Sequence, residues 1–142
     1  MQGHITLLKI IFYSSFESCR IVALQIYTSA NQNDARIQNE SINTGALELV
    51  ELLKKEQTMK MKENLLSAVS ATIRGENLEA KRILIRLDGL ELLEKLFQNA
   101  SAKLKHKINV LLRDLLFYDD RLHLTHNDLS KFNNTAGIKV NG

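Results

Sequence analysis

The sequence predicts an all-α fold of stacked helical repeats, and three observations support this fold class. The 142 residues include no proline, where average usage would give about seven, so long helices run without interruption. Tryptophan is also absent and only 6% of the residues are aromatic, which leaves leucine, isoleucine and valine to form the core. Such a core suits helices packed on helices better than a β-sandwich. The third observation is an internal repeat with a period of 42 to 44 residues.

Three glycines mark the start of the same helix in successive copies of the repeat. Gly3, Gly45 and Gly89 lie 42 and 44 residues apart. The fourth, seventh and eighth residues after each glycine are apolar, and this spacing places them on one face of a helix. They are Leu7, Leu49 and Leu93, then Ile10, Leu52 and Leu96, then Ile11, Leu53 and Phe97. The glycine permits a sharp corner before the helix, through its backbone conformation or through a close approach that a Cβ atom would hinder.

A long helix and a short helix precede each later glycine. Residues 21–27 align without a gap with residues 65–71, and a third copy of this long helix follows over 108–116. Short helical segments are expected over 34–42 and 78–87. Each unit therefore consists of a long helix, a short helix, a glycine corner and a second long helix.

The length and composition of the unit favour one repeat class. Armadillo and HEAT units both have about this length. A three-helix armadillo unit fits better than a two-helix HEAT unit, because the proline common in HEAT turns is absent from this chain. We expect an armadillo-like right-handed α-solenoid, a superhelix with about two full three-helix repeats plus partial repeats at both ends. Stacking such units buries faces that one unit alone would leave exposed.

The repeat pattern predicts how the chain is divided. Residues 1–122 are expected to form the helical repeat domain, and residues 123–142 a polar tail that is disordered or holds a short helix around 124–132. The apolar face of residues 5–12 has no preceding unit to cover it. This predicts a fragment of a longer superhelix or a truncated gene product.

Charge and cysteine content restrict the partners. The 19 Lys and Arg residues and 16 Asp and Glu residues alternate along the chain and give a net charge of +3, which does not favour a nucleic-acid partner. The basic run 103–107 is interpreted as the solvated first turn of a helix, with contact to acidic groups of a partner as the alternative. No apolar run of about 18 residues occurs, so membrane insertion is not expected. The single Cys19 is expected to be a small buried thiol, and the chain a monomer.

Catalytic, metal and cofactor sites are not expected. The neighbouring carboxylates Asp119 and Asp120 do not converge with a His, Ser or Lys in a catalytic pattern. His123 and His126 have the spacing of a ligand pair on one helix face, but no third ligand is placed beside them. The glycines are isolated, so none forms a phosphate-binding loop.

At this level of detail the chain resembles a known family, the armadillo-type nucleotide exchange factors of heat shock protein 70 chaperones. In that family a helix with an "LSAxSxxIR" pattern leads to a "GL" corner, and the next unit begins with a basic helix that ends in "LLxDLL". The matching stretches here are residues 65–76, 89–93 and 105–116. The similarity covers residues 17–121, and generic armadillo proteins less often share Ile73–Arg74 and Asp114–Leu116.

The family has a cytosolic branch and a branch in the lumen of the endoplasmic reticulum. The luminal branch serves the chaperone BiP, and the chain is most similar to its SIL-type member. Three sequons, at Asn39, Asn99 and Asn133, favour the luminal branch as N-glycosylation sites. The chain shows neither a signal peptide nor a retention tail, which is expected of a fragment and also of a cytosolic protein.

The resemblance implies a co-chaperone that binds the nucleotide-binding domain of a chaperone such as BiP and promotes ADP release, with no catalytic residue and no cofactor of its own. Its concave surface would grip one lobe of that domain. The outward positions three and six residues after each glycine are the candidate contacts: Thr6, Glu48, Leu92, Lys9, Glu51 and Lys95. The alternative is a generic armadillo scaffold that binds a peptide in its groove. The absence of an asparagine ladder from these positions weakens it.

Overall fold

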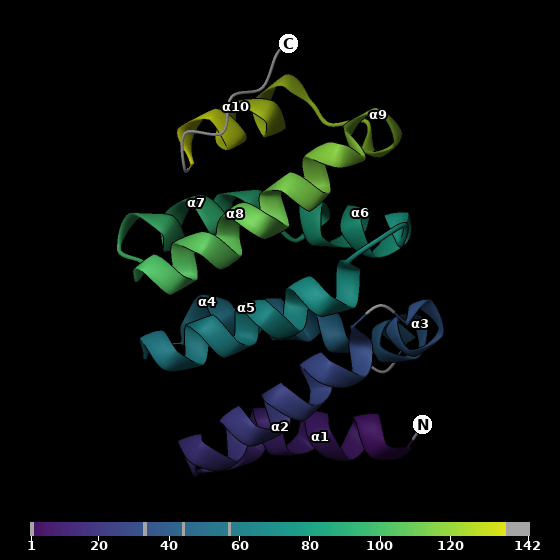
Figure 1. Ribbon diagram of the computed structural model, residues 1–142, viewed down its shortest axis with the longest axis vertical. Helices are drawn as coiled ribbons and strands as arrows, with labels where there is room; N and C mark the ends of the chain where they lie inside the picture. Colours follow the sequence, from purple (N-terminus) through teal and green to yellow (C-terminus); the bar gives the residue numbers. More distant parts are fainter. Residues whose placement is uncertain (1, 33, 44, 57, 136–142) are drawn as a thin grey trace. The chain divides into compact units, whose positions relative to one another are not determined.

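A computed structural model describes residues 2–32, 34–43, 45–56 and 58–135, and in these ranges the chain is built from ten α-helices and one short 3-10 helix (Figure 1). The all-α prediction is confirmed. None of the described helices has the length and apolar character needed to cross a membrane. The chain divides into two compact units, Met1–Asn77 and Leu78–Gly142.

The first unit contains five α-helices and the 3-10 helix η1 among its described residues. They are α1 (Gln2–Tyr13), α2 (Glu17–Asn31), α3 (Ala35–Asn43), η1 (Ala46–Glu48), α4 (Leu49–Lys55) and α5 (Met59–Ile73). Helix α2 packs against both α1 and α5, and α5 also packs against α4. Leucines at the predicted repeat positions form much of the core, since Leu24, Leu49 and Leu65 are fully buried.

The second unit is organised around α7. Its described helices are α6 (Leu78–Arg86), α7 (Gly89–Gln98), α8 (Ala102–Phe117), α9 (Asp119–Leu122) and α10 (His126–Asn134). Helix α7 contacts α6, α8 and α10, and α9 packs against α6. The short helices expected over 34–42 and 78–87 are present as α3 and α6.

Side-chain caps set where several helices begin. The hydroxyl of Thr58 accepts a hydrogen bond from the Met61 amide at the start of α5, and Ser101 does the same for Leu104 in α8. Thr125 and Asp128 form a reciprocal capping box at the start of α10. A capped start of this kind stabilises a helix by roughly 1 kcal/mol, which explains how a short polar segment becomes helical.

A residue in the left-handed conformation precedes the last helix of each of the three repeats that follow α1. The φ angles are +96° at Gly45, +60° at Asp88 and +55° at His123. The third corner lies where the sequence predicted a polar tail, and α10 follows it close to the expected short helix over 124–132. The third repeat therefore has all three helices, α8, α9 and α10, while the division into a domain over 1–122 and a tail stays a prediction.

Two parts of the core are polar. In the first unit, the Gln38 side chain donates hydrogen bonds to the carbonyl oxygens of Asn31 and Ala71, at 3.2 and 2.9 Å, and so links α3 to α2 and α5. In the second unit, the fully buried Lys81 lies 2.8 Å from the Asp114 carboxylate, which joins α6 to α8. Lys81 also lies 5.0 Å from the centre of the Tyr118 ring.

The expectation that Cys19 is buried is wrong. Its thiol is exposed, because α2 buries the face that carries Ile21, Leu24 and Tyr27. Cys19 lies two positions before Ile21, which is about 200° around the helix. The buried Ile21 therefore points to the opposite side, and the next apolar residue, Val22, is itself 54% exposed.

Candidate functional site

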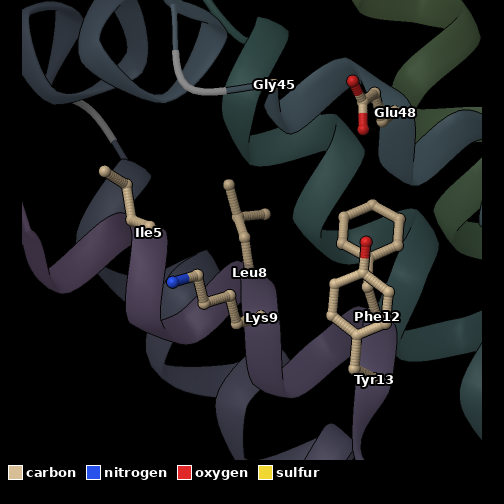
Figure 2. Close-up of a pocket in the computed structure, with 7 residues that line it drawn as sticks. All are labelled: Ile5, Leu8, Lys9, Phe12, Tyr13, Gly45 and Glu48. Carbon is tan, nitrogen blue, oxygen red and sulfur yellow. The ribbon is translucent and has the colours of Figure 1, made fainter.

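A hollow of about 220 Å³ lies between α1 and the Gly45 corner, and it brings together two of the predicted contact residues, Lys9 and Glu48. Figure 2 shows the side chains of α1 on one side of it and Glu48 on the other. The lining residues are Ile5, Leu8, Lys9, Phe12, Tyr13, Gly45 and Glu48. The hollow thus has an apolar wall with one basic and one acidic side chain.

The helical period of α1 builds the apolar wall. Ile5, Leu8 and Phe12 are spaced three and four residues apart, so they lie on one face. Leu8 is 6% exposed, whereas Ile5 is 44% exposed and Tyr13 is 84% exposed. The wall therefore has Leu8 in the core, while Ile5 and Tyr13 are open to solvent.

Gly45 makes the opposite wall. Its left-handed backbone turns the chain between α3 and η1, and η1 carries Glu48. The Glu48 carboxyl group lies close to the glycine: a Cβ atom at position 45 would be 3.6 Å from Glu48 Cδ. A single corner residue thus fixes where the acidic side chain of the hollow sits.

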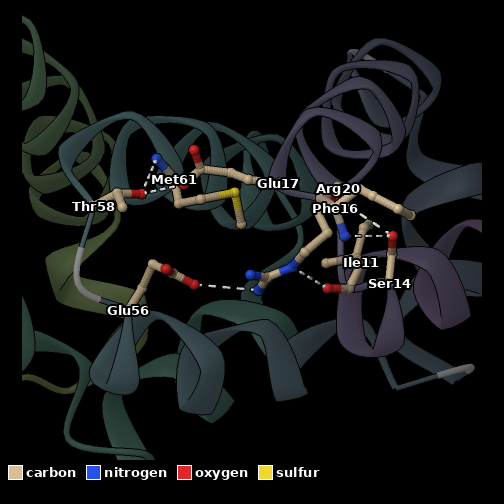
Figure 3. Close-up of polar contacts among 8 residues, drawn as sticks. All are labelled: Ile11, Ser14, Phe16, Glu17, Arg20, Glu56, Thr58 and Met61. Carbon is tan, nitrogen blue, oxygen red and sulfur yellow. Dashed lines mark hydrogen bonds and ion pairs between the residues drawn. The ribbon is translucent and has the colours of Figure 1, made fainter.

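A half-buried arginine, Arg20, links the two helices beside the hollow, α1 and α4 (Figure 3). Arg20 Nε donates a hydrogen bond to the Ile11 carbonyl at 2.8 Å, near the C-terminal end of α1. Its other guanidinium nitrogen lies 3.2 Å from Glu56 Oε2, just past the end of α4, and both side chains are about 15% exposed. A cation near a helix C-terminus is favourable. Arg20 therefore holds the ends of α1 and α4 in a fixed arrangement.

A second polar link supports the same region. The Thr58 hydroxyl donates a hydrogen bond to the Glu17 carboxylate at 2.6 Å, which joins the first turn of α2 to the N-terminal cap of α5. Sequence reasoning missed both links, since Arg20 and Glu56 are 36 residues apart and neither is in an outward position of the repeat. The pairing of Arg20 with Glu56 is visible only once the helices are placed.

The other predicted contacts have different surroundings. Thr6 and Glu51 are exposed, and Glu51 lies 3.1 Å from Lys54. Lys95 in the second unit is exposed and lies 3.2 Å from Glu91.

The expected outward position of Leu92 is wrong, since Leu92 is only 8% exposed. It lies on α7, and α10 packs against that helix in a part of the chain where the sequence predicted a polar tail.

The buried Tyr27 is a structural group of the first unit. Burial raises the pKa of its phenol, and hydrogen-bonding groups of Ser41, Thr72 and Asn31 oppose that shift. The side chain is fully buried, so it belongs to the core that holds α2 and α3 and not to the hollow. Among the described residues, His, Cys, Asp and Glu do not form a group of three that would hold a metal ion.

A family model described as the SIL1/FES1/HPBP1 C-terminal domain matches residues 2–139. The chain belongs to this family. Its members are nucleotide exchange factors of heat shock protein 70 chaperones, which act by binding the chaperone and not as enzymes in the usual sense. Searches of the curated proteins and of the solved structures returned no match.

Family membership gives the hollow a context. The family includes members in the lumen of the endoplasmic reticulum and in the cytosol. The all-helical architecture is the armadillo-like type expected for the family. Exchange factors of this family act by binding the chaperone, so a contact surface and not an acid–base pair is the kind of site to look for.

The three sequons differ in their surroundings. Asn99 is exposed at the end of α7, two residues before the cap of α8. Asn39 is exposed on α3, where its side-chain oxygen accepts a hydrogen bond from Asn77 at 3.2 Å. Asn133 falls within α10, and its side chain lies outside the described part of the structure. Of the two described sites, Asn99 lies at a helix end, whereas Asn39 lies within a helix and is hydrogen-bonded.

Proposed function

We propose that this chain binds the nucleotide-binding domain of BiP and promotes ADP release, with the hollow beside α1 as part of the contact surface. The observation that carries the proposal is the family match over residues 2–139. The hollow adds a surface suited to a protein partner, because Ile5 and Tyr13 are exposed beside one basic and one acidic side chain.

The proposed mechanism is a shift of population. A factor that binds the open cleft of the chaperone more tightly than the closed cleft favours the open state by that difference in affinity. A tenfold difference corresponds to about 1.4 kcal/mol. The open cleft releases ADP and admits ATP. The charges of Lys9 and Glu48 would fix how the partner is oriented on the hollow, because the partner must place an acidic group opposite Lys9 and a basic group opposite Glu48.

Release of a fluorescent ADP analogue tests the partner. Purified BiP and a cytosolic heat shock protein 70 chaperone are each loaded with the analogue, and its release is followed with and without the 142-residue chain. We expect faster release from BiP than from the cytosolic chaperone. Equal acceleration of both would contradict the assignment to BiP, and no acceleration of either would contradict exchange activity for this chain.

Charge reversal tests the surface. Lys9→Glu and Glu48→Lys should each slow the stimulated release, because each introduces a like-charge contact with the partner. Arg36→Glu and Glu76→Lys are matched controls, since both residues are exposed and lie away from the hollow. If the controls and the hollow variants lose the same activity, the hollow is not part of the contact.

The compartment is a separate part of the proposal. We infer that the protein works in the lumen of the endoplasmic reticulum and carries a glycan at Asn99, because that sequon is exposed at a helix end. Protein from its natural source should shift in mobility after endoglycosidase treatment, and an Asn99→Gln variant should lose one step of that shift. An unshifted protein that fractionates with the cytosol would overturn this inference.

A further inference from the structure

The exposed face of α8 carries a row of basic residues that ends in an aromatic side chain. Lys103, His106, Arg113 and Phe117 are exposed, and Val110 between them is half-buried. Their spacing of three, four, three and four residues places all five on one side of the helix. Phe117 is 75% exposed. These five residues are called the α8 stripe below.

The core of the second unit lies on the other side of α8. Leu104, Ile108, Leu111 and Leu115 are fully buried there. They alternate with the stripe at the helical period, so the two faces are about 150° apart. None of the three basic residues of the stripe has an ion-pair partner among the residues that the structure describes. The three basic residues of the stripe therefore face solvent, while the Phe117 ring lies edge-on against Tyr118 with 4.9 Å between the ring centres.

Helix stability does not explain the position of these charges. Lys103, Lys105 and Lys107 lie in the first two turns of α8, and the first turn holds no acidic residue. The N-terminal end of a helix carries a partial positive charge, so lysines there are unfavourable by some tenths of a kcal/mol each. Lys105 gains a contact with the Phe97 ring, 5.2 Å from its centre, so the unexplained charge is that of Lys103, which belongs to the stripe. A residue that breaks a local rule without a structural gain is expected at a functional surface.

We propose that the α8 stripe docks an acidic segment of a protein partner, with an apolar side chain of that segment packed on Phe117. Lys103 and Phe117 are 14 residues apart on the helix, which corresponds to about 21 Å. An extended segment of about six or seven residues spans that length. Carboxylates of the segment face Lys103 and Arg113. This surface is separate from the hollow beside α1, and the proposal does not depend on exchange activity.

Charge complementarity favours this occupant over two others. A second copy of the stripe would bring its own Lys103 and Arg113 against like charges. A nucleic acid is disfavoured because the stripe offers one aromatic ring, whereas stacking surfaces for single strands use several. An acidic segment with one apolar anchor fits both the charges and Phe117.

Binding of a labelled peptide to the full chain tests the proposal. The probe is a fluorescein-labelled peptide of eight glutamates and one leucine, and the control peptide has glutamine in place of every glutamate. Fluorescence anisotropy at low ionic strength should show binding of the acidic peptide only. Lys103→Glu combined with Arg113→Glu should weaken it at least tenfold, and Phe117→Ala about threefold. The matched control, Arg36→Glu combined with Lys60→Glu, removes the same charge from exposed positions of the first unit and should weaken binding less than twofold.

Several outcomes would overturn the proposal. Equal losses in the two double variants would show general attraction to a basic protein and not a site on α8. Absence of binding, or equal binding of the glutamine peptide, would remove the acidic segment as occupant. Tighter binding of labelled single-stranded DNA than of the peptide would assign the stripe to nucleic acid. A dimer in sedimentation experiments that the Lys103→Glu and Arg113→Glu changes alter would assign it to a second copy.

Discussion

The corner at Gly45 and the corner at Gly89 occupy the same place in the repeat, but they differ in how much room they leave. At Gly45 the left-handed backbone itself requires glycine, and a Cβ atom there would be in ordinary contact with Glu48 only. At Gly89 the left-handed residue is the preceding Asp88, and a Cβ atom on the glycine would lie 2.6 Å from the Leu84 carbonyl oxygen. The first corner borders a hollow, whereas the second is filled by α6.

The comparison shows that an aligned glycine can serve two different purposes. In the first copy it supplies a backbone conformation, and in the second it supplies a close approach between helices. The third corner has no glycine. His123 adopts the left-handed conformation there, at the cost of some backbone strain. Substitutions at the three corners test these roles, and Arg20→Ala tests the polar link beside the first corner. The largest effect is expected at Gly89.

Gly89→Ala should destabilise the second unit by about 3 kcal/mol, because the added methyl group meets backbone and no flexible side-chain end can absorb it. Urea unfolding followed by circular dichroism measures the loss. Gly3→Ala is the control, since nothing lies within 4 Å of the added Cβ atom in helix α1. A loss at position 89 no larger than that at position 45 would remove the distinction between the two corners.

Arg20→Ala should destabilise the first unit by about 2 kcal/mol, because it removes the hydrogen bond to the Ile11 carbonyl and leaves the Glu56 carboxylate without its cation. The same urea titration reports this loss. Restoring stability by the additional change Glu56→Gln would support the pairing. If the double variant is no more stable than Arg20→Ala alone, the ion pair does not hold the ends of α1 and α4.

Gly45→Ala should cost about 1 kcal/mol, since an L residue is strained at a φ of +96° but meets no backbone there. Gly45→Asn should cost less, because asparagine tolerates this region better than alanine. Thermal unfolding of the two variants gives the comparison. Equal stability of all three proteins would show that the backbone conformation at this corner is not a constraint.

His123→Gly should stabilise the third repeat by about 0.5 kcal/mol, because glycine adopts the left-handed conformation without strain. His126→Gly, in the first turn of α10, is the matched control and should destabilise by a similar amount. Hydrogen exchange of the α10 amides resolves differences of this size. If His123→Gly lowers the stability instead, the contacts of the histidine side chain stabilise the repeat by more than its backbone strain destabilises it.

Much of the helix pattern was predictable from sequence, because it follows from short-range periodicity. The helices α3 and α6 and the corner at Gly45 could be located from apolar spacing and glycine alone. The corner at His123 lacks a glycine, so the residues after it were expected to be a polar tail and not the last helix of a third repeat. Lys9 and Glu48 were identified by their place in the repeat, and the structure brings both to one hollow.

Contacts between distant segments were not predictable from the same signals. Leu92 was expected to face outward because its position in the repeat suggested it, and the packing of α10 on α7 was not visible in the sequence. Arg20 pairs with Glu56 across 36 residues. The exposure of Cys19 depends on which face of α2 is covered, which its apolar sequence neighbours do not reveal.

The affinity of the chain for a chaperone nucleotide-binding domain, measured with and without saturating ADP, tests the central claim most directly. By thermodynamic linkage, a protein that weakens the binding of ADP to the domain must itself bind the ADP-loaded domain more weakly. The two affinities fall by the same ratio. We predict that the chain binds the ADP-bound domain of BiP at least tenfold more weakly than the domain without ADP. The Lys9→Glu variant should bind the domain more weakly than the unchanged chain, and the Arg36→Glu variant should not. Equal affinity with and without ADP would contradict the account.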